Sequence, residues 1–247
     1  MKVSTYFSAV EAESAEVAGS DAVVIDVIRA TSTMVEALAA GARAIYPTVS
    51  SEDAIRLANS LGREDTLLCG ERKGLKIPGF DLGNSPGEFT AASVAGRRLV
   101  MSTTNGTRAF AAARDAERAI AASLLNLSAV IRSLADSKQV TIICAGKEGR
   151  YALDDAVCAG LIVRGLVGKG SDGRATDSVH LDDASRTVLA LASSFTADVD
   201  FLRSTAAGVA LVEVGLGDDL VHCAIQDRHA LVPEMRDRMI RLPGAAS

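Results

Sequence analysis

The chain has 247 residues, of which 48% are hydrophobic and only 4% aromatic, with no tryptophan. Its formal net charge is −5 and no segment is rich in lysine and arginine, so we expect no nucleic-acid partner. No apolar run approaches the roughly 18 residues that span a bilayer, and the first residues lack the pattern of a secretory signal, so we expect a cytoplasmic protein with no membrane partner.

Strands and helices alternate along most of the chain. Apolar runs predict strands at 3–7 (an edge strand), 22–27, 44–47, 66–69, 99–102, 119–122 and 140–144. Helical patterns follow at 31–40, from Ser51, and at 106–114, 126–135 and 154–167, while residues 11–16 form an acidic loop or short helix. This order predicts a three-layer α/β/α fold with a parallel or mixed central sheet.

Two segments depart from the alternation. Residues 70–86 contain four glycines and two prolines, and a loop of this length inside a domain is typically functional. The polar residues 168–178 mark a candidate subdomain boundary. Beyond them, 182–183, 206–212 and 221–225 predict helices and one strand that complete the same core. We therefore expect a single domain over 1–247.

Polar residues follow four of the predicted strands, and the carboxyl ends of parallel strands are where ligands collect in open α/β sheets. These residues are Asp26 with Arg29 and 31–33, Glu71, the run 102–107, and Lys147 with Glu148; residues 81, 84 and 85 and the pair 154–155 add to them. Carboxylates, hydroxyls and an arginine at one edge predict a phosphate site with a hard divalent cation, Mg²⁺.

The predicted roles divide these residues into three groups. The predicted metal ligands are Asp26, Glu71 and Asp81. The predicted phosphate-binding residues are Arg29, Thr31, Ser32, Thr103, Thr104, Asn105, Gly106 and Thr107, with Asn84 and Ser85 as loop contacts. The predicted catalytic residues are Asp26, Glu148 and Asp155, of which Glu148 or Asp155 serves as general acid or base.

Structural alternatives exist for several of these residues. Thr and Asn at a strand-to-helix turn also cap helices, and the acids at 154–155 also complement a helix macrodipole. An alternative interpretation of Glu71 and Asp81 is that they are loop acids exposed to solvent. Asp26 interrupts an apolar strand, where an unpaired carboxylate is costly to bury, which favours a ligand or an arginine partner.

A second phosphatase mechanism is also open. Residues 144–150 have the Cys-x5-Arg spacing of cysteine-dependent phosphatases, in which a thiolate is the nucleophile. Glu148 would repel phosphate there, and Tyr151 stands where that class has Ser or Thr. No P-loop or dinucleotide-binding motif is present. The other cysteines are widely spaced, so reduced thiols are expected.

Five ordered segments resemble the 2-phosphosulfolactate phosphatase family. They are DVIRATSTMVEALAAGA (26–42), GERKGLKIPGFDLGNSP (70–86), STTNGTRA (102–109), the ICAG turn, and LDDAVCAG (153–160), with CAIQDRHALVPEM (223–235) resembling the family's ending. The resemblance implies an α/β/α phosphatase that depends on Mg²⁺. It also implies hydrolysis of 2-phosphosulfolactate to 3-sulfolactate and inorganic phosphate, a step in coenzyme M biosynthesis.

These motifs indicate the reaction more clearly than they indicate the substrate. Arg72, Lys73, Lys76 or Arg150 could bind a sulfonate, and the sequence does not select among them. Another phosphorylated 2-hydroxy acid is an alternative substrate. The rival functions are a non-catalytic protein that binds phosphorylated metabolites and a metal-dependent lyase or isomerase. The alanine-rich helices are compatible with a homodimer.

Overall fold

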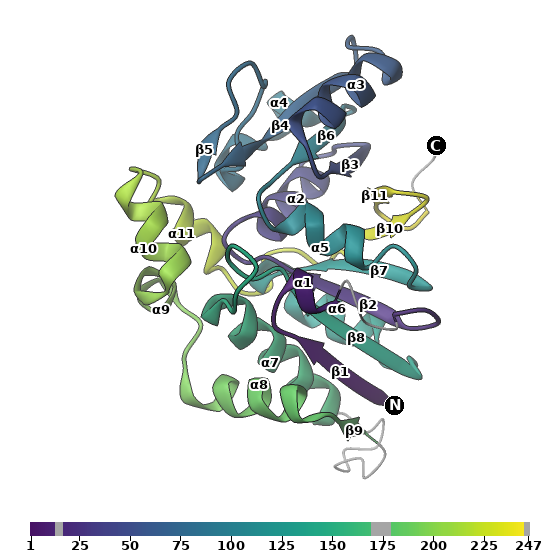
Figure 1. Ribbon diagram of the computed structural model, residues 1–247, viewed down its shortest axis with the longest axis vertical. Coiled ribbons are helices and arrows are strands. Elements are labelled where there is room, and N and C mark those ends of the chain that lie inside the picture. The colour runs from purple at the N-terminus through teal and green to yellow at the C-terminus, as the bar shows by residue number, and fades with distance from the viewer. Residues whose placement is uncertain (13–16, 169–178, 245–247) are drawn as a thin grey trace.

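The computed structural model describes residues 1–12, 17–168 and 179–244 (Figure 1). The predicted boundary at 168–178 and residues 13–16 of the predicted acidic segment therefore lie almost wholly outside the described residues. No helix in the described ranges is both long enough and apolar enough to cross a membrane.

The described residues form one large mixed sheet with helices on both faces, which confirms the predicted α/β/α class. The strands are β1 (Lys2–Tyr6), β2 (Asp21–Ile25), β3 (Ala44–Thr48), β4 (Thr66–Arg72), β5 (Leu75–Lys76), β6 (Arg98–Ser102), β7 (Arg118–Ala122), β8 (Gln139–Cys144), β9 (His180–Leu181), β10 (Glu234–Arg236) and β11 (Met239–Arg241). The helices are α1 (Ala9–Ala12), α2 (Ala30–Ala39), α3 (Ser51–Leu61), α4 (Ala91–Val94), α5 (Gly106–Ala112), α6 (Leu127–Ser133), α7 (Leu153–Val167), α8 (Asp183–Ser194), α9 (Val199–Ser204), α10 (Ala206–Glu213) and α11 (Asp219–Cys223), with 3-10 turns at Pro86–Glu88 and Leu124–Asn126.

The strand order is β5-β4-β6-β3-β11-β10-β7-β2-β8-β1-β9. Pairing is parallel within β4-β6-β3 and within β7-β2-β8-β1-β9. The antiparallel hairpin β10-β11 lies between these two parallel groups and joins β7 to β3. Strand β1, predicted at an edge, is second from the end because the two-residue β9 pairs with it.

Alternate residues of β2 point to opposite faces of the sheet, as the strand geometry requires. Val23 and Ile25 belong to a core formed with α6, α7 and α8. Ala22 and Val24 belong to a second core formed with α1, α2 and α5. Because both faces of β2 are covered, residues 22–25 of the strand are apolar, and the next polar side chain comes directly after the strand, at Asp26.

Two parts of the chain differ from the prediction. The predicted loop 70–86 begins as a β-hairpin, since β4 extends to Arg72 and pairs with β5. The last residues form the β10-β11 hairpin, although the prediction for this region was helices and one strand. The other predicted strands and helices agree with the structure to within a few residues, whereas α4, α9 and β9 were not predicted.

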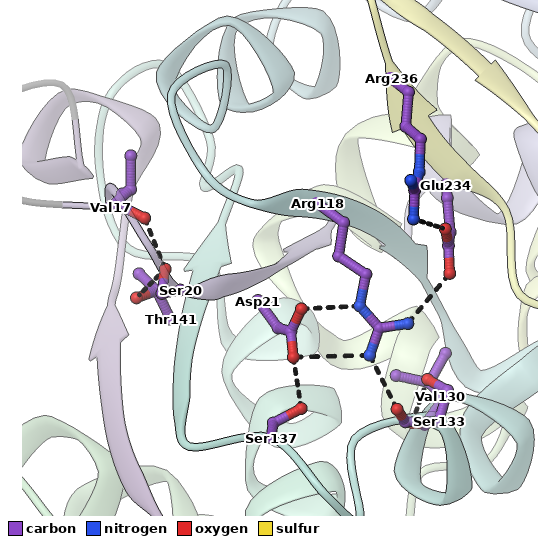
Figure 2. A network of polar contacts seen from close by, with 10 residues as sticks. All are labelled: Val17, Ser20, Asp21, Arg118, Val130, Ser133, Ser137, Thr141, Glu234 and Arg236. Atoms are coloured by element: carbon purple, nitrogen blue, oxygen red, sulfur yellow. Dashed lines mark hydrogen bonds and ion pairs between the residues drawn. The ribbon is translucent and has the colours of Figure 1, made fainter.

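A partly buried ion-pair network fastens the C-terminal hairpin to the sheet (Figure 2). Arg118, the first residue of β7, donates from Nε to Asp21 Oδ1 at 2.6 Å and from Nη1 to Glu234 Oε1 at 3.0 Å. Its Nη2 donates to the Ser133 carbonyl at 2.7 Å, and the Ser137 hydroxyl donates to Asp21. Since Asp21 opens β2 and Asp26 follows it, this network lies at the edge of the sheet opposite to the polar strand ends.

Candidate active site

A cavity of about 420 Å³ opens where β2, β4, β6 and β8 end. Eight of the predicted site residues line it: Asp26, Arg29, Glu71, Asn84, Thr104, Asn105, Glu148 and Asp155. Segments that are far apart in the sequence thus meet at one pocket, as the strand-end argument predicted. The lining also includes one face of α10, which packs beside the β4-β5 hairpin in Figure 1.

Asp26 is the buried acid at the end of β2, with 6% of its surface exposed. Its Oδ1 accepts a hydrogen bond from the Ala30 amide at 3.1 Å, and Oδ2 receives none from the described residues. Burial raises the Asp26 pKa to about 7, with smaller contributions from the negative charges of Glu71 and Asp154. Gly106 packs against this carboxylate, because a Cβ there would lie 2.8 Å from Asp26 Oδ2.

Asp154 and Asp155 open α7 and have different environments. Asp155 accepts from the Val27 amide at 2.9 Å and from the Gly146 amide at 3.0 Å, so it joins the turns after β2 and β8. Burial raises its pKa, as do the charges of Asp154 and Asp26, against the two amides. Asp154 is also buried, yet its Oδ1 has no hydrogen-bond partner in the described structure. Burial raises the Asp154 pKa to about 6, although Lys147 opposes the rise.

Arg29 provides a fixed positive charge beside these acids. Its guanidinium is 3% exposed and pairs with Asp219 of α11 through an Nη1–Oδ2 distance of 2.6 Å. It also donates to Ser85 Oγ at 3.1 Å and to the Gly74 carbonyl at 2.5 Å. The peptide bond that precedes it, from Ile28, is cis. Arg29 therefore connects three segments of the pocket wall.

Glu71 joins the β4-β5 hairpin to the turn after β6. Its Oε2 accepts from the Gly74 amide at 2.8 Å and its Oε1 accepts from the Thr104 amide at 2.7 Å. Since both oxygens already bind backbone N–H groups, Glu71 acts first as a positioning residue for the pocket wall. The side chain of Asn105 does the same on the opposite wall, where its Oδ1 accepts from the Glu148 amide at 3.1 Å.

Within the described part of the chain, three oxygens at the pocket are buried without a hydrogen-bond partner. They belong to Asn84 Oδ1, Thr104 Oγ1 and Asp154 Oδ1. Buried polar atoms without partners are rare in proteins, and those at a pocket indicate a ligand or ion. Carboxylate and amide oxygens are donors that Mg²⁺ accepts. The described residues contain no cluster of three His, Cys, Asp or Glu side chains arranged around one metal position. The donor set therefore fits Mg²⁺, which is commonly held by one or two carboxylates together with water and phosphate oxygens.

Four hydroxyl groups that were predicted to bind phosphate form hydrogen bonds with backbone groups instead. Thr31 Oγ1 donates to the Asp26 carbonyl at 2.8 Å, and Ser32 Oγ donates to the Val27 carbonyl at 2.8 Å. Thr107 Oγ1 donates to the Thr103 carbonyl at 2.9 Å, and Thr103 Oγ1 accepts from the Thr107 amide at 3.2 Å. These side chains shape the turns after β2 and β6, and they do not line the cavity.

Asp81, a predicted metal ligand, does not meet Asp26 and Glu71 at the pocket. Its Oδ2 accepts from the Leu68 amide at 2.7 Å and pairs with Arg63 at 2.9 Å, outside the cavity lining. After the β4-β5 hairpin the chain returns alongside β4 and places Asp81 next to Leu68, before the end of that strand. The sequence could not separate Asp81 from the acids that do reach the pocket, because this segment was predicted as a loop.

Cys144 lacks the properties of a nucleophilic thiol. The residue is fully buried in β8 and is absent from the cavity lining. Burial raises the pKa of its thiol, and the charge of Asp155 raises it further. A reactive cysteine needs a lowered pKa and an accessible sulfur, so the structure contradicts the cysteine-dependent alternative. The four cysteines are all buried and unpaired.

The prediction missed one wall of the pocket. Ala207, Ala210, Leu211, Glu213 and Val214, in and just after α10, line the cavity without having been expected there. Small apolar side chains at helical spacing look alike on a core helix and on a pocket wall, so the sequence carried no signal for them. Asp154 was one of the noted helix-opening acids but was not assigned a role, and Lys147 was noted only at its strand end.

Fold and site together define an α/β protein with a polar, acid-rich pocket at the carboxyl edge of its sheet. The profile of the 2-phosphosulpholactate phosphatase family matches residues 7–238. The chain belongs to this family, whose members are classed as phosphoric monoester hydrolases.

Curated relatives cover nearly the whole chain. A protein of Thermus thermophilus named probable 2-phosphosulfolactate phosphatase is 44% identical over 219 residues, which are 87% of this chain and 88% of the relative. Proteins with the same name from Symbiobacterium thermophilum and Clostridium perfringens are 40% identical over 228 residues and 37% identical over 245 residues. These matches span 92% and 98% of this chain, and 96% of each relative.

Proposed function

We propose that the protein hydrolyses 2-phosphosulfolactate to 3-sulfolactate and inorganic phosphate in a reaction that depends on Mg²⁺. The observation that carries the proposal is the unpartnered oxygen of Asp154 beside Asp26 and Arg29 at one pocket. The printed names of the relatives support the substrate. A role in coenzyme M biosynthesis stays a prediction from the family resemblance.

Asp26 and Asp154 are the carboxylates that would hold Mg²⁺, with Asn84 Oδ1 as a neutral donor. Both acids are buried at the pocket, and each has an oxygen that receives no hydrogen bond from the described residues. Burial that raises a carboxyl pKa is relieved when a cation binds the charged form. When bound, Mg²⁺ offsets the negative charge of the phosphate and lowers the pKa of water.

The remaining residues have separate tasks in the proposed reaction. Arg29 is held in place by Asp219, so its positive charge is fixed before a phosphate arrives. Water attacks phosphorus and gives up a proton, the P–O bond to the hydroxy acid breaks, and the departing oxygen takes up a proton. Glu148 is the better proton donor, because both oxygens of Asp155 already accept backbone amides. The Glu148 carboxyl lines the pocket and has no side-chain partner in the described structure.

Phosphate release from 2-phosphosulfolactate tests this proposal. We expect the purified protein to release phosphate with Mg²⁺, to lose activity in EDTA and to regain it when Mg²⁺ is restored. Asp154→Asn should lower kcat/KM by roughly 100-fold or more, because a charged oxygen at the reacting centre is lost.

Asp81→Asn is the matched control, because it removes an acid of the predicted metal set that lies outside the pocket. It should keep most of the activity, as should Cys144→Ser. No release from 2-phosphosulfolactate would contradict the proposed reaction. Release that persists in EDTA would contradict the metal requirement. A product that retains its phosphate would indicate a lyase or isomerase.

A further inference from the structure

The structure separates the four cations that the sequence left as equal candidates for the substrate's sulfonate. Of Arg72, Lys73, Lys76 and Arg150, only Lys73 lines the cavity. We infer that Lys73 recognises the sulfonate, and thereby sets the preference for substrates that carry a sulfonate in addition to the carboxylate. This inference rests on the proposed function, whose substrate carries a phosphate, a carboxylate and a sulfonate.

The neighbouring Arg72 is already engaged elsewhere. Its guanidinium donates to the Glu71 carbonyl at 2.7 Å, to the Val49 carbonyl at 3.2 Å and to Ser102 Oγ at 2.8 Å. These contacts hold the side chain against β6, away from the cavity. The Arg72 side chain therefore stabilises the hairpin and does not face a ligand in the cavity.

The backbone of Lys73 is held firmly while its ammonium group stays free. Lys73 and Gly74 form the two-residue turn of the β4-β5 hairpin, with φ values of 53° and 82°. Both angles are positive, as a type I′ turn requires. The Gly74 amide donates to Glu71 and the Gly74 carbonyl accepts from Arg29, so two pocket residues fix the turn. The exposed Lys73 side chain forms no hydrogen bond or ion pair with the described residues.

Lys73 is also the cation on the hairpin wall of the pocket. The cationic side chains in the described cavity lining are those of Arg29, Lys73 and Lys147. Arg29 is the residue that we propose for the phosphate, and Lys147 follows β8 on the side of the acids that we propose for Mg²⁺, whereas Lys73 stands on the β4-β5 hairpin. A sulfonate offers three oxygen acceptors and an ammonium group offers three N–H donors, so Lys73 has the chemistry to bind it.

Two substrates that differ by the sulfonate test the inference: 2-phosphosulfolactate and 2-phospholactate. We expect Lys73→Met to lower kcat/KM for the sulfonated substrate by about tenfold or more, and for 2-phospholactate by less than about threefold. Lys76→Met removes the same charge from the same hairpin outside the cavity, and it should leave the ratio of the two values unchanged. Lys73→Arg should keep most of the preference.

Calorimetric titration with 3-sulfolactate and with lactate gives a second readout that does not require turnover. Weaker binding of 3-sulfolactate to Lys73→Met, with lactate binding unchanged, would support the inference even if the wild type hydrolysed neither ester and the proposed function failed. An equal loss on both esters, an unchanged ratio in Lys73→Met, or the same 3-sulfolactate affinity in wild type and variant would overturn it.

Discussion

At the scale of single residues, Asp26 combines burial with a raised pKa, and this has a consequence for stability. The pKa rises from 3.8 to about 7, chiefly because the carboxylate is removed from water. Between these values the folded protein retains a proton that the unfolded chain has already lost. Folding stability contributed by Asp26 is therefore fully present at low pH, and it is lost as the pH rises toward 7.

Asp26→Asn should remove this pH dependence. In EDTA, we expect the free energy of unfolding of the wild type to fall, relative to that of the variant, by on the order of 3 kcal/mol as the pH rises through this window. Urea denaturation at several pH values measures the difference. Curves for the two proteins that stay parallel across the window would show that Asp26 ionises normally in the folded state.

At the scale of elements, the ion pair of Arg29 and Asp219 joins the turn after β2 to α11. The arginine side chain is 3% exposed and that of the aspartate 11%, so water weakens their attraction little. Helix α11 lies close to α9, and α10 lines the cavity in the same part of the molecule (Figure 1). The pair thus connects the helices near the pocket to the residue that we propose for phosphate binding.

Asp219→Asn should leave Arg29 buried without its counter-charge. We expect a loss of about 2 kcal/mol in the free energy of unfolding, and a rise in KM of about tenfold because the guanidinium is no longer fixed. Thermal unfolding and steady-state kinetics measure the two effects. Asp218→Asn is the matched control, because Asp218 is the exposed neighbour of Asp219. Equal effects of the two substitutions would contradict a role for the ion pair.

At the scale of the whole molecule, the hairpin β10-β11 closes the gap between two parallel groups of strands. The network around Arg118 in Figure 2 secures it from the edge opposite to the pocket. Arg118→Met should lower the free energy of unfolding by about 2 kcal/mol, because Asp21 and Glu234 lose their shared partner. Its kcat/KM, measured per folded molecule, should stay within about twofold of the wild-type value.

Arg114→Met serves as the control, since Arg114 is exposed and its ion-pair partner among the described residues is its neighbour Asp115. It should leave the free energy of unfolding nearly unchanged. A large loss of activity in folded Arg118→Met would mean that the hairpin network communicates with the pocket.

The pattern of apolar and polar residues along the sequence was enough to predict most of the parallel strands and the pocket residues that lie at the strand ends. Asp26, Glu71 and Asn105 were found because each lies at or just after the end of a predicted apolar strand, where ligands collect in α/β sheets. The hairpin β10-β11 was missed because its strands, EMR and MIR, have three residues each and too little alternation to read. Leu211 and Val214 were missed because the sequence does not distinguish an apolar residue that lines a cavity from one that packs in the core.

The most direct test of the account is a crystal structure of the protein with Mn²⁺, as an anomalous substitute for Mg²⁺, and vanadate as a phosphate analogue. We expect the metal beside Asp26 and Asp154, and the anion in the same pocket within hydrogen-bond distance of Arg29. Metal and anion bound on another face of the molecule, or a pocket that binds neither, would contradict it.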